Sequence, residues 1–263
     1  MTNREKERKL VELLKGYGSA VIAYSGGTDS TLLALLAKRA LGDDHLAVTA
    51  SSQTYTTGEL RLAKAIAKRF GFNHMIITTD ELDDPLFAAN PVERCYHCKS
   101  HLMKSIAAIA LQKGMRHILD GTNADDAADF RPGRKAALEW GVKSPFLEAG
   151  LNKAEIRRIA RREGLPNWNK PANACLASRV PYGTMIDQDT LRRIERAEAA
   201  LGKLGFTRCR VRHHGDIARI ELMPADLAKA IKQRTQIIRQ LKSAGYIFVT
   251  LDLAGYQMGC FNP

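Results

Sequence analysis

The chain has 263 residues, 45% of them hydrophobic, which is enough for one large domain or a medium domain with a small one. No apolar run approaches the length of a membrane span, and the charged residues 1–9 lack the apolar core of a secretion signal, so we expect a cytoplasmic protein without a membrane partner. The net charge of +12 favours phosphate-bearing partners, such as nucleotides, phosphorylated metabolites or RNA.

Apolar runs that alternate with amphipathic segments predict a parallel, doubly wound α/β sheet. The expected helices of this part are residues 3–16, 31–41, 58–70, 99–112 and 153–163, and the expected strands are residues 20–23, 45–50, 74–79 and 117–120. Ligands of such sheets bind beyond the carboxyl ends of the strands. That edge is expected to collect Ser51, Gly121 and Thr122.

The pattern changes near Pro181, which divides the chain into expected domains at residues 1–180 and 181–263. The second part is predicted to be a small α+β domain. Its expected helices are residues 188–204 and 225–241, and its expected strands lie near residues 209–212, 218–222 and 247–251.

The segment at residues 25–30, which we name the glycine turn, follows the first strand after Ala23 and reads Ser25, Gly26, Gly27, Thr28, Asp29, Ser30. Glycines let the backbone approach a phosphate, and the following helix offers free N–H groups and the positive end of its dipole. The turn lacks the Gly-Lys-Ser/Thr of a Walker A loop and the Gly-x-Gly-x-x-Gly of a dinucleotide turn. Asp29 suits either a helix-end partner or a neighbour of Mg²⁺.

An ordinary strand-to-helix turn rich in small residues is the alternative. The six residues, however, match Ser-Gly-Gly-x-Asp-Ser, and the segment resembles the ATP pyrophosphatase (PP-loop) superfamily. The resemblance implies that ATP is cleaved between its α and β phosphates with transfer of AMP to a substrate oxygen.

Five cysteines, two of them in a Cys-x-x-Cys, favour metal or redox chemistry over structural disulfides in a cytosolic enzyme. Cys95 and Cys98 are expected in a loop that enters a helix, where they can bind one metal ion or adjacent irons of a cluster. Two buried thiols are the alternative. Cys175, close to Arg179, fits a reactive thiolate, whereas Cys209 and Cys260 are expected to be structural.

Several further segments together resemble the LarE family over nearly the whole chain. They are Cys-Leu-Ala-Ser-Arg at 175–179, Asp-Gly-Thr-Asn-x-Asp-Asp at 120–126, Ser-Pro-Phe at 144–146, Lys-x-Glu-Ile-Arg at 153–157 and Arg-Val-Arg-His-His-Gly at 210–215. The resemblance implies an ATP-dependent sulfur transferase of nickel-pincer nucleotide biosynthesis. The implied substrate is pyridinium-3,5-biscarboxylic acid mononucleotide, one carboxylate of which is adenylylated and then becomes a thiocarboxylate.

The family has two sulfur sources. In one type the cysteine matching Cys175 gives up its own sulfur, and in the other three cysteines hold a 4Fe-4S cluster whose fourth iron carries a sulfide. The presence of Cys95, Cys98 and Cys175 resembles the cluster type, and three thiolates leave one iron open. The implied cofactors are therefore ATP, Mg²⁺ and a 4Fe-4S cluster, with sulfide or another sulfur donor as a partner.

The site residues follow from these motifs. Asp29 and Cys175 are expected to be catalytic, and the nucleotide is expected at the glycine turn with Ala23, Ser51, Gly121 and Thr122. Arg210 and Arg212 share one strand face and suit a substrate phosphate, although a surface ion-pair cluster is the alternative. The family resemblance also implies that Asp125, Ser178, Arg179, Glu198 and Glu221 bind substrate, with Glu198 and Glu221 matching family positions for substrate or metal.

Other functions fit parts of the pattern. A tRNA thiolase combines the same turn with a Cys-x-x-Cys and a distant cysteine, but no zinc ribbon or RNA-binding module is recognisable, so nucleic acid is not an expected partner. An amide-forming ligase would need ammonia, and a nucleotide-sensing or iron–sulfur carrier protein would bind ATP without releasing pyrophosphate. The family resemblance also implies a homo-oligomer, a trimer or a hexamer.

Overall fold

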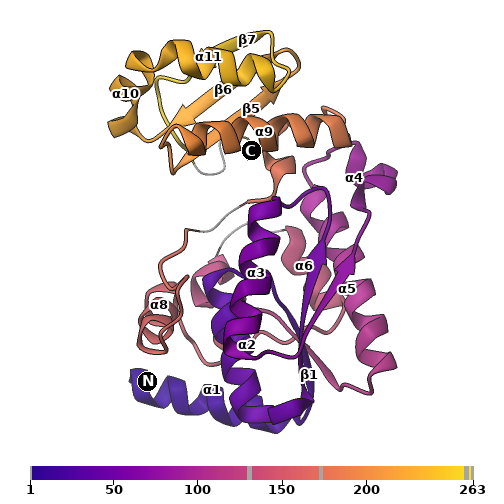
Figure 1. Cartoon of the computed structure of the whole chain (residues 1–263). Helices are drawn as coiled ribbons and strands as arrows, with labels where there is room; N and C mark the ends of the chain where they lie inside the picture. The colour runs from indigo at the N-terminus through magenta and orange to yellow at the C-terminus, as the bar shows by residue number, and fades with distance from the viewer. Residues whose placement is uncertain (1, 129–131, 172–173, 258–260, 262–263) are drawn as a thin grey trace. The chain divides into compact units, whose positions relative to one another are not determined.

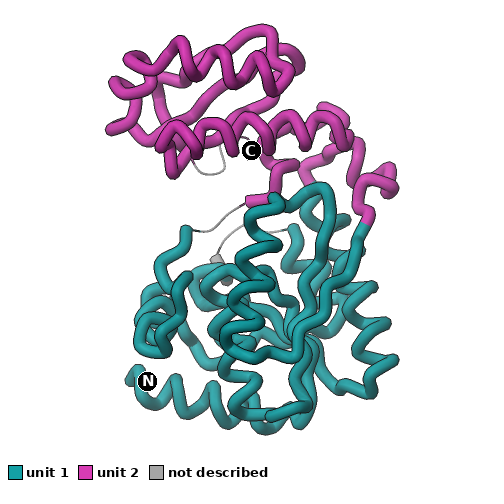
Figure 2. The backbone as a smooth tube through the Cα atoms, in the orientation of Figure 1, with its two compact units in different colours: residues 1–79, 93–173 teal, residues 80–92, 174–263 magenta. Residues whose placement is uncertain are grey.

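The structure is a computed structural model that describes residues 2–128, 132–171, 174–257 and 261, with the backbone alone for residues 127 and 128. The chain forms two compact units, residues 1–79 with 93–173 and residues 80–92 with 174–263 (Figure 2). The domain boundary expected at residues 180–181 stays a prediction. The short segment 80–92, which carries α4 (Pro85–Ala88), belongs to the second unit, a feature that the sequence did not indicate.

The first unit contains a four-stranded, wholly parallel sheet in the order β3-β2-β1-β4. The strands are β1 (Ala20–Ala23), β2 (His45–Ser51), β3 (His74–Thr78) and β4 (His117–Leu119). The register aligns Ala20 with His45 and with His117, so the strands begin at one edge of the sheet and end at the other. The predicted parallel α/β sheet is therefore confirmed.

Alternate residues of β1 point to opposite faces of the sheet, and helices cover both faces. Ala20 and Ile22 lie in a core with α1 (Asn3–Tyr17), α2 (Thr28–Leu41), α3 (Thr57–Phe70), α7 (Pro145–Glu148) and α8 (Lys153–Arg162). Val21 lies in a second core with α5 (Arg94–Gln112) and α6 (Pro132–Glu139), on the other face (Figure 1). This division is the doubly wound arrangement.

The first strand, β1, is the point where the strand order reverses, because the chain passes to β2 on one side and reaches β4 on the other. In open α/β sheets a crevice forms outside the carboxyl ends of the strands at such a point. The glycine turn leaves β1 there and enters α2, and Gly121 follows β4 beside it.

One helix boundary differs from the expectation. Helix α5 begins at Arg94 rather than at Lys99, so Cys95 and Cys98 lie in the first two turns of the helix and not in a loop before it. Within the described residues no side chain caps this helix end, since Glu93 makes no capping hydrogen bond. The usual sequence signal for a helix start is therefore missing.

The second unit contains a three-stranded mixed sheet in the order β5-β6-β7, formed by β5 (Cys209–His214), β6 (Ile217–Leu222) and β7 (Phe248–Leu251). β5 pairs antiparallel with β6, and β6 pairs parallel with β7. Helices α9 (Gln188–Lys203) and α11 (Arg234–Ser243) contribute Leu201 and Leu241 to its core. The small α+β unit was predicted, but the expected helix 225–241 is divided at Gln233, which lies between α10 (Leu227–Lys232) and α11.

No helix in the described ranges is long and apolar enough to cross a membrane.

Candidate active site

The glycine turn places the amino end of α2 at the carboxyl edge of the sheet. Ser25 Oγ and Ser30 Oγ lie 3.0 Å apart, and the Ser25 amide donates to Ser30 Oγ at 3.2 Å. The first N–H groups of a helix lack intrahelical acceptors, and the dipole adds a partial positive charge at this end. This geometry suits an anion, and the binding of the nucleotide phosphates at the turn stays a prediction.

Two glycines allow the close approaches on which the turn depends. Gly26 has φ +70°, and a Cβ built on it would lie 2.9 Å from Ala63 Cβ of α3. A Cβ on Gly121 would lie 3.1 Å from Asp29 Cβ and 3.1 Å from the Ser30 amide. No larger residue fits at Gly26 without moving α3.

Asp29 lies in the first turn of α2 and pairs with Lys153, the first residue of α8, at 2.5 Å. The Lys153 amide in turn donates to Asp125 Oδ2 at 3.0 Å, so Asp125 contacts the start of α8. Burial raises the pKa of Asp29 above its ordinary value and Asp126 adds to the rise, whereas Lys153 opposes it. A cation beside Asp29 would favour the ionised form of this carboxylate.

Three of the expected nucleotide residues make other contacts. The Thr28 hydroxyl donates to the Asn167 carbonyl at 2.7 Å, and the Thr122 hydroxyl donates to Asp120 Oδ2 at 2.9 Å. Ser51 ends β2, where its carbonyl accepts from the Thr79 amide. The roles of these residues in nucleotide binding stay predictions.

Asn167 also contacts the turn, although the sequence pattern did not indicate it. Its Nδ2 donates to the Gly26 carbonyl and to Thr31 Oγ1, both at 2.9 Å. It comes from an irregular segment far along the chain from the turn, in which no hydrophobic period and no known motif points to it.

Cys95 and Cys98 are one helical turn apart near the start of α5, with Cys95 exposed and Cys98 half-buried. Side chains at i and i+3 lie on one face of a helix, which fits two ligands of one cluster. Gly133 of α6 packs against this end of α5, since its Cβ would lie 3.3 Å from the Cys95 carbonyl.

Cys175 belongs to the second unit, where it is half-buried. Within the described parts of the chain, no three His, Cys, Asp or Glu side chains are grouped closely enough to hold a metal ion. The structure places Cys95 and Cys98 on one face of α5, and their role as cluster ligands with Cys175 stays a prediction. Cys260 lies outside the described residues.

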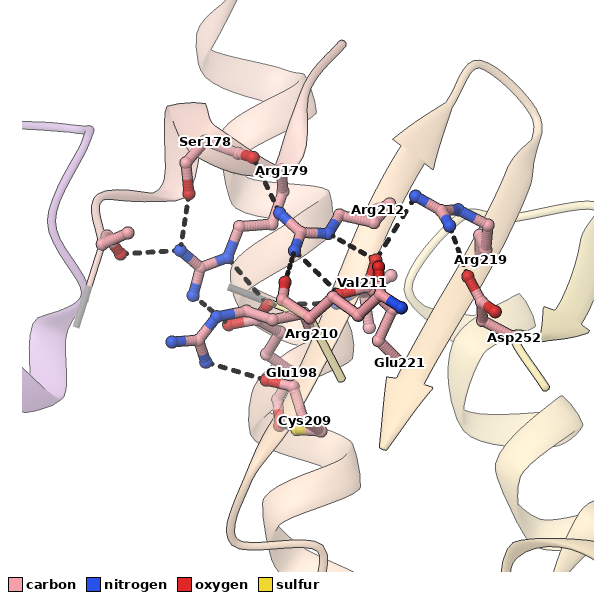
Figure 3. A network of polar contacts seen from close by, with 12 residues as sticks. Ser178, Arg179, Glu198, Cys209, Arg210, Val211, Arg212, Arg219, Glu221 and Asp252 are labelled. Carbon is pink, nitrogen blue, oxygen red and sulfur yellow. Dashed lines mark hydrogen bonds and ion pairs between the residues drawn. The ribbon is translucent and has the colours of Figure 1, made fainter. Parts of the chain in front are cut away.

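In the second unit Arg179 holds the loop that carries Cys175. Its guanidinium makes two bonds of 2.9 Å to the Glu198 carboxylate (Figure 3). Its Nη1 donates to the carbonyls of Ala174 and Cys175. Arg179 is 1% exposed. A buried guanidinium paired in this bidentate way fixes its acceptors in place.

A second buried pair lies beside the first. Arg212 makes bonds of 2.9 and 2.7 Å to the Glu221 carboxylate, and its Nη1 donates to the Ser178 carbonyl at 2.9 Å (Figure 3). Arg219 extends the network from Glu221 to Asp252. Five of the residues expected to bind substrate thus lie in one network of contacts with each other: Ser178, Arg179, Glu198, Arg212 and Glu221. These contacts are also those of the alternative, an ion-pair cluster, and the role of the five residues in substrate binding stays a prediction.

Arg210 lies on the same strand, where Nη1 donates to the Cys209 carbonyl and the guanidinium carbon lies 5.4 Å from the centre of the Tyr256 ring. Burial lowers the pKa of Arg210, and the neighbouring Arg179 lowers it further. A phosphate close to Arg210 would relieve this repulsion.

Comparison with known proteins extends these observations. The NAD synthase family profile matches residues 8–105. Over 258 residues, 98% of this chain and 94% of the other, the chain is 39% identical to the pyridinium-3,5-bisthiocarboxylic acid mononucleotide synthase of Lactiplantibacillus plantarum. It is 42% identical to an uncharacterized protein of Synechocystis over 97% of both chains. One chain of the glutamine-hydrolyzing GMP synthase of Methanothermobacter thermautotrophicus is 28% identical over 57% of this chain and 51% of its own length.

The parallel sheet, the glycine turn and the NAD synthase match define an ATP-dependent enzyme of the PP-loop class, whose members form AMP and pyrophosphate. The similarity to the Lactiplantibacillus protein covers both units rather than the sheet alone. The chain belongs to the LarE family, that of pyridinium-3,5-bisthiocarboxylic acid mononucleotide synthase.

The reactivity of Cys209 can be compared with that of the exposed Cys95. Burial is the main cause that raises the pKa of the Cys209 thiol to about 12, and the negative charge of Glu198 adds to it. Only about one part in ten thousand of this thiol is ionised at pH 8, and the thiolate is the nucleophile. Iodoacetamide applied at pH 8 to the folded, metal-free chain should therefore label the exposed Cys95 and leave Cys209 unmodified, as measured by peptide mass mapping. Unfolding in urea is the control, and equal labelling of both cysteines before unfolding would contradict the described burial.

Proposed function

We propose that this protein uses ATP to convert a carboxylate of pyridinium-3,5-biscarboxylic acid mononucleotide into a thiocarboxylate. The observation that carries the proposal is the 39% identity over 98% of the chain to a protein named for the bisthiocarboxylic product. The anion site at the glycine turn supports the ATP-dependent step. The GMP synthase match covers only 57% of the chain and so gives less support to amide formation.

The first step is the transfer of AMP. A carboxylate oxygen of the substrate attacks the α-phosphorus of ATP, a P–O bond forms, and pyrophosphate leaves with the electrons of the broken P–O bond. We propose that the amides at the start of α2 bind the phosphates and that Asp29 lies beside Mg²⁺, which neutralises the charge on the leaving group. Lys153, now paired with Asp29, would then be released toward the phosphates.

The second step replaces AMP by sulfur. A sulfur nucleophile attacks the acyl carbon, and AMP leaves carrying the former carboxylate oxygen. We propose that Cys95, Cys98 and Cys175 hold a 4Fe-4S cluster, which when bound supplies the sulfur from an open iron. The helical pair Cys95 and Cys98 supports two of these ligands. Loss of the Cys175 sulfur itself is the alternative source.

The second unit is proposed to bind the mononucleotide. Arg210, whose cationic form is disfavoured by burial and by Arg179, is the side chain that we propose for the substrate phosphate. The Arg179–Glu198 and Arg212–Glu221 pairs would act by holding the Cys175 loop and the strand that carries Arg210. The proposed assembly is a homo-oligomer, supported by the exposed and adjacent Ile217 and Phe248, and light scattering would measure its size.

The glycine-turn assignment predicts the effect of Asp29→Asn. Loss of the carboxylate should lower pyrophosphate release with ATP, Mg²⁺ and the mononucleotide at least about 100-fold, because the variant lacks the charged group proposed to lie beside the Mg²⁺ that neutralises the departing phosphates. The matched control is Asp43→Asn in the 3-10 turn Gly42–Asp44 before β2, at the opposite edge of the sheet. A rate for Asp29→Asn within twofold of the control would remove Asp29 from the nucleotide site.

The ligand assignment predicts the metal content of two variants. After anaerobic reconstitution, Cys95→Ala and Cys98→Ala should each lose most of their iron and acid-labile sulfide, since each removes one thiolate ligand. Cys209→Ala is the control, because this buried thiol is not a proposed ligand and its variant should keep full iron. Full iron and sulfide in both ligand variants would contradict the ligand assignment. Loss of the Cys175 sulfur itself would then be the remaining sulfur source.

A further inference from the structure

Asn167 is a buried polar residue of the first unit, at 5% exposed, and its contacts converge on the glycine turn. Its side-chain nitrogen donates to the Gly26 carbonyl and to Thr31 Oγ1, and its backbone carbonyl accepts from the Thr28 hydroxyl. One residue thus contacts both the turn and the first turn of α2. The remaining acceptor, Asn167 Oδ1, is buried and has no hydrogen-bond donor among the described residues.

The orientation of the Asn167 amide follows from its neighbours. The Gly26 carbonyl is only an acceptor, so the side-chain atom 2.9 Å from it must be the nitrogen. This leaves Oδ1 unpaired in the interior, which is unfavourable. A leucine of similar size would remove the unpaired atom, but it would also leave the Gly26 carbonyl without the Asn167 donor. The bond to Gly26 is therefore the contact that the asparagine supplies to the turn.

The contact with Gly26 determines which way the turn presents its donors. In a trans peptide the C=O and the following N–H point in opposite directions. Because the Gly26 carbonyl points toward Asn167, the Gly27 N–H points away from it, where its nearest acceptor is Ser25 Oγ at 3.3 Å. Gly26 has no side chain to oppose a flip of this peptide, and glycine populates both signs of φ with little preference.

We propose that Asn167 is a positioning residue for ATP binding, which keeps the peptide between Gly26 and Gly27 in the orientation that directs its N–H at a phosphate. The inference rests on the proposed ATP site but not on the sulfur chemistry. Asn167 touches the turn and not the reacting atoms. Its role is therefore in the affinity of the ground-state nucleotide complex and not in the identity of the sulfur donor.

The test compares three variants of the full chain by equilibrium binding of ATP with Mg²⁺. Asn167→Leu keeps the volume and removes the bond to Gly26, and it should weaken ATP binding about tenfold or more. Thr31→Val removes the hydroxyl of α2 that accepts from Asn167 and keeps the bond between Asn167 and Gly26. Because the lost bond is not made to the turn, ATP binding should weaken by less than about threefold. The KM for the mononucleotide should stay unchanged in both.

His45→Ala separates positioning from general stability. His45 is 2% exposed and bonds the Gly42 carbonyl and the Asn73 amide at the opposite edge of the sheet, so its loss should lower Tm without changing ATP affinity. If Asn167→Leu binds ATP as tightly as the wild type, the positioning role of Asn167 is overturned while the proposed function stands. The same holds if His45→Ala loses as much ATP affinity as Asn167→Leu. Failure of the wild type to bind ATP would overturn both this inference and the proposed function.

Discussion

The contact between Gly26 and α3 is the constraint on which the first unit depends. The backbone of Gly26 passes so close to Ala63 that no Cβ fits between them, and this approach turns the chain from β1 into α2 at the centre of the sheet. The turn thereby aligns the helix dipole and free amides with the crevice where the strand order reverses. Gly121, which follows β4, makes a similar approach to Asp29 and to the Ser30 amide at the start of α2.

The second unit contains buried arginine side chains whose charges must be paired. Arg179 and Arg212 are almost wholly buried, and each is paired in bidentate fashion with a glutamate. Such pairs contribute little net stability relative to apolar side chains, but removal of one partner leaves a buried charge and is strongly destabilising. We interpret the network as a rigid frame for the Cys175 loop, since both arginines also bind carbonyls of residues 174–178.

The sequence predicted the features that depend on local pattern. The parallel sheet follows from periodicity, and the structure confirms it. The glycine spacing at residues 25–30 predicts a turn into a helix, which the structure also shows, while the binding of an anion there stays a prediction. The sequence did not indicate Asn167, because a hydrogen bond between residues 26 and 167 leaves no local pattern. The start of α5 was predicted wrongly, because no capping side chain marks it. Arg212 lies beside its partner only through the antiparallel register of β5 and β6, which sequence spacing alone does not fix.

The central claim is that ATP activates a carboxyl group so that sulfur can displace AMP. Substrate labelled with ¹⁸O in its carboxylates tests this most directly, with mass spectrometry of the nucleotide product after one turnover. The account predicts that each AMP carries one ¹⁸O atom, because the acyl–oxygen bond breaks when sulfur attacks. Unlabelled AMP formed together with a thiocarboxylate product would contradict the claim, since it would mean that sulfur enters without an acyl adenylate.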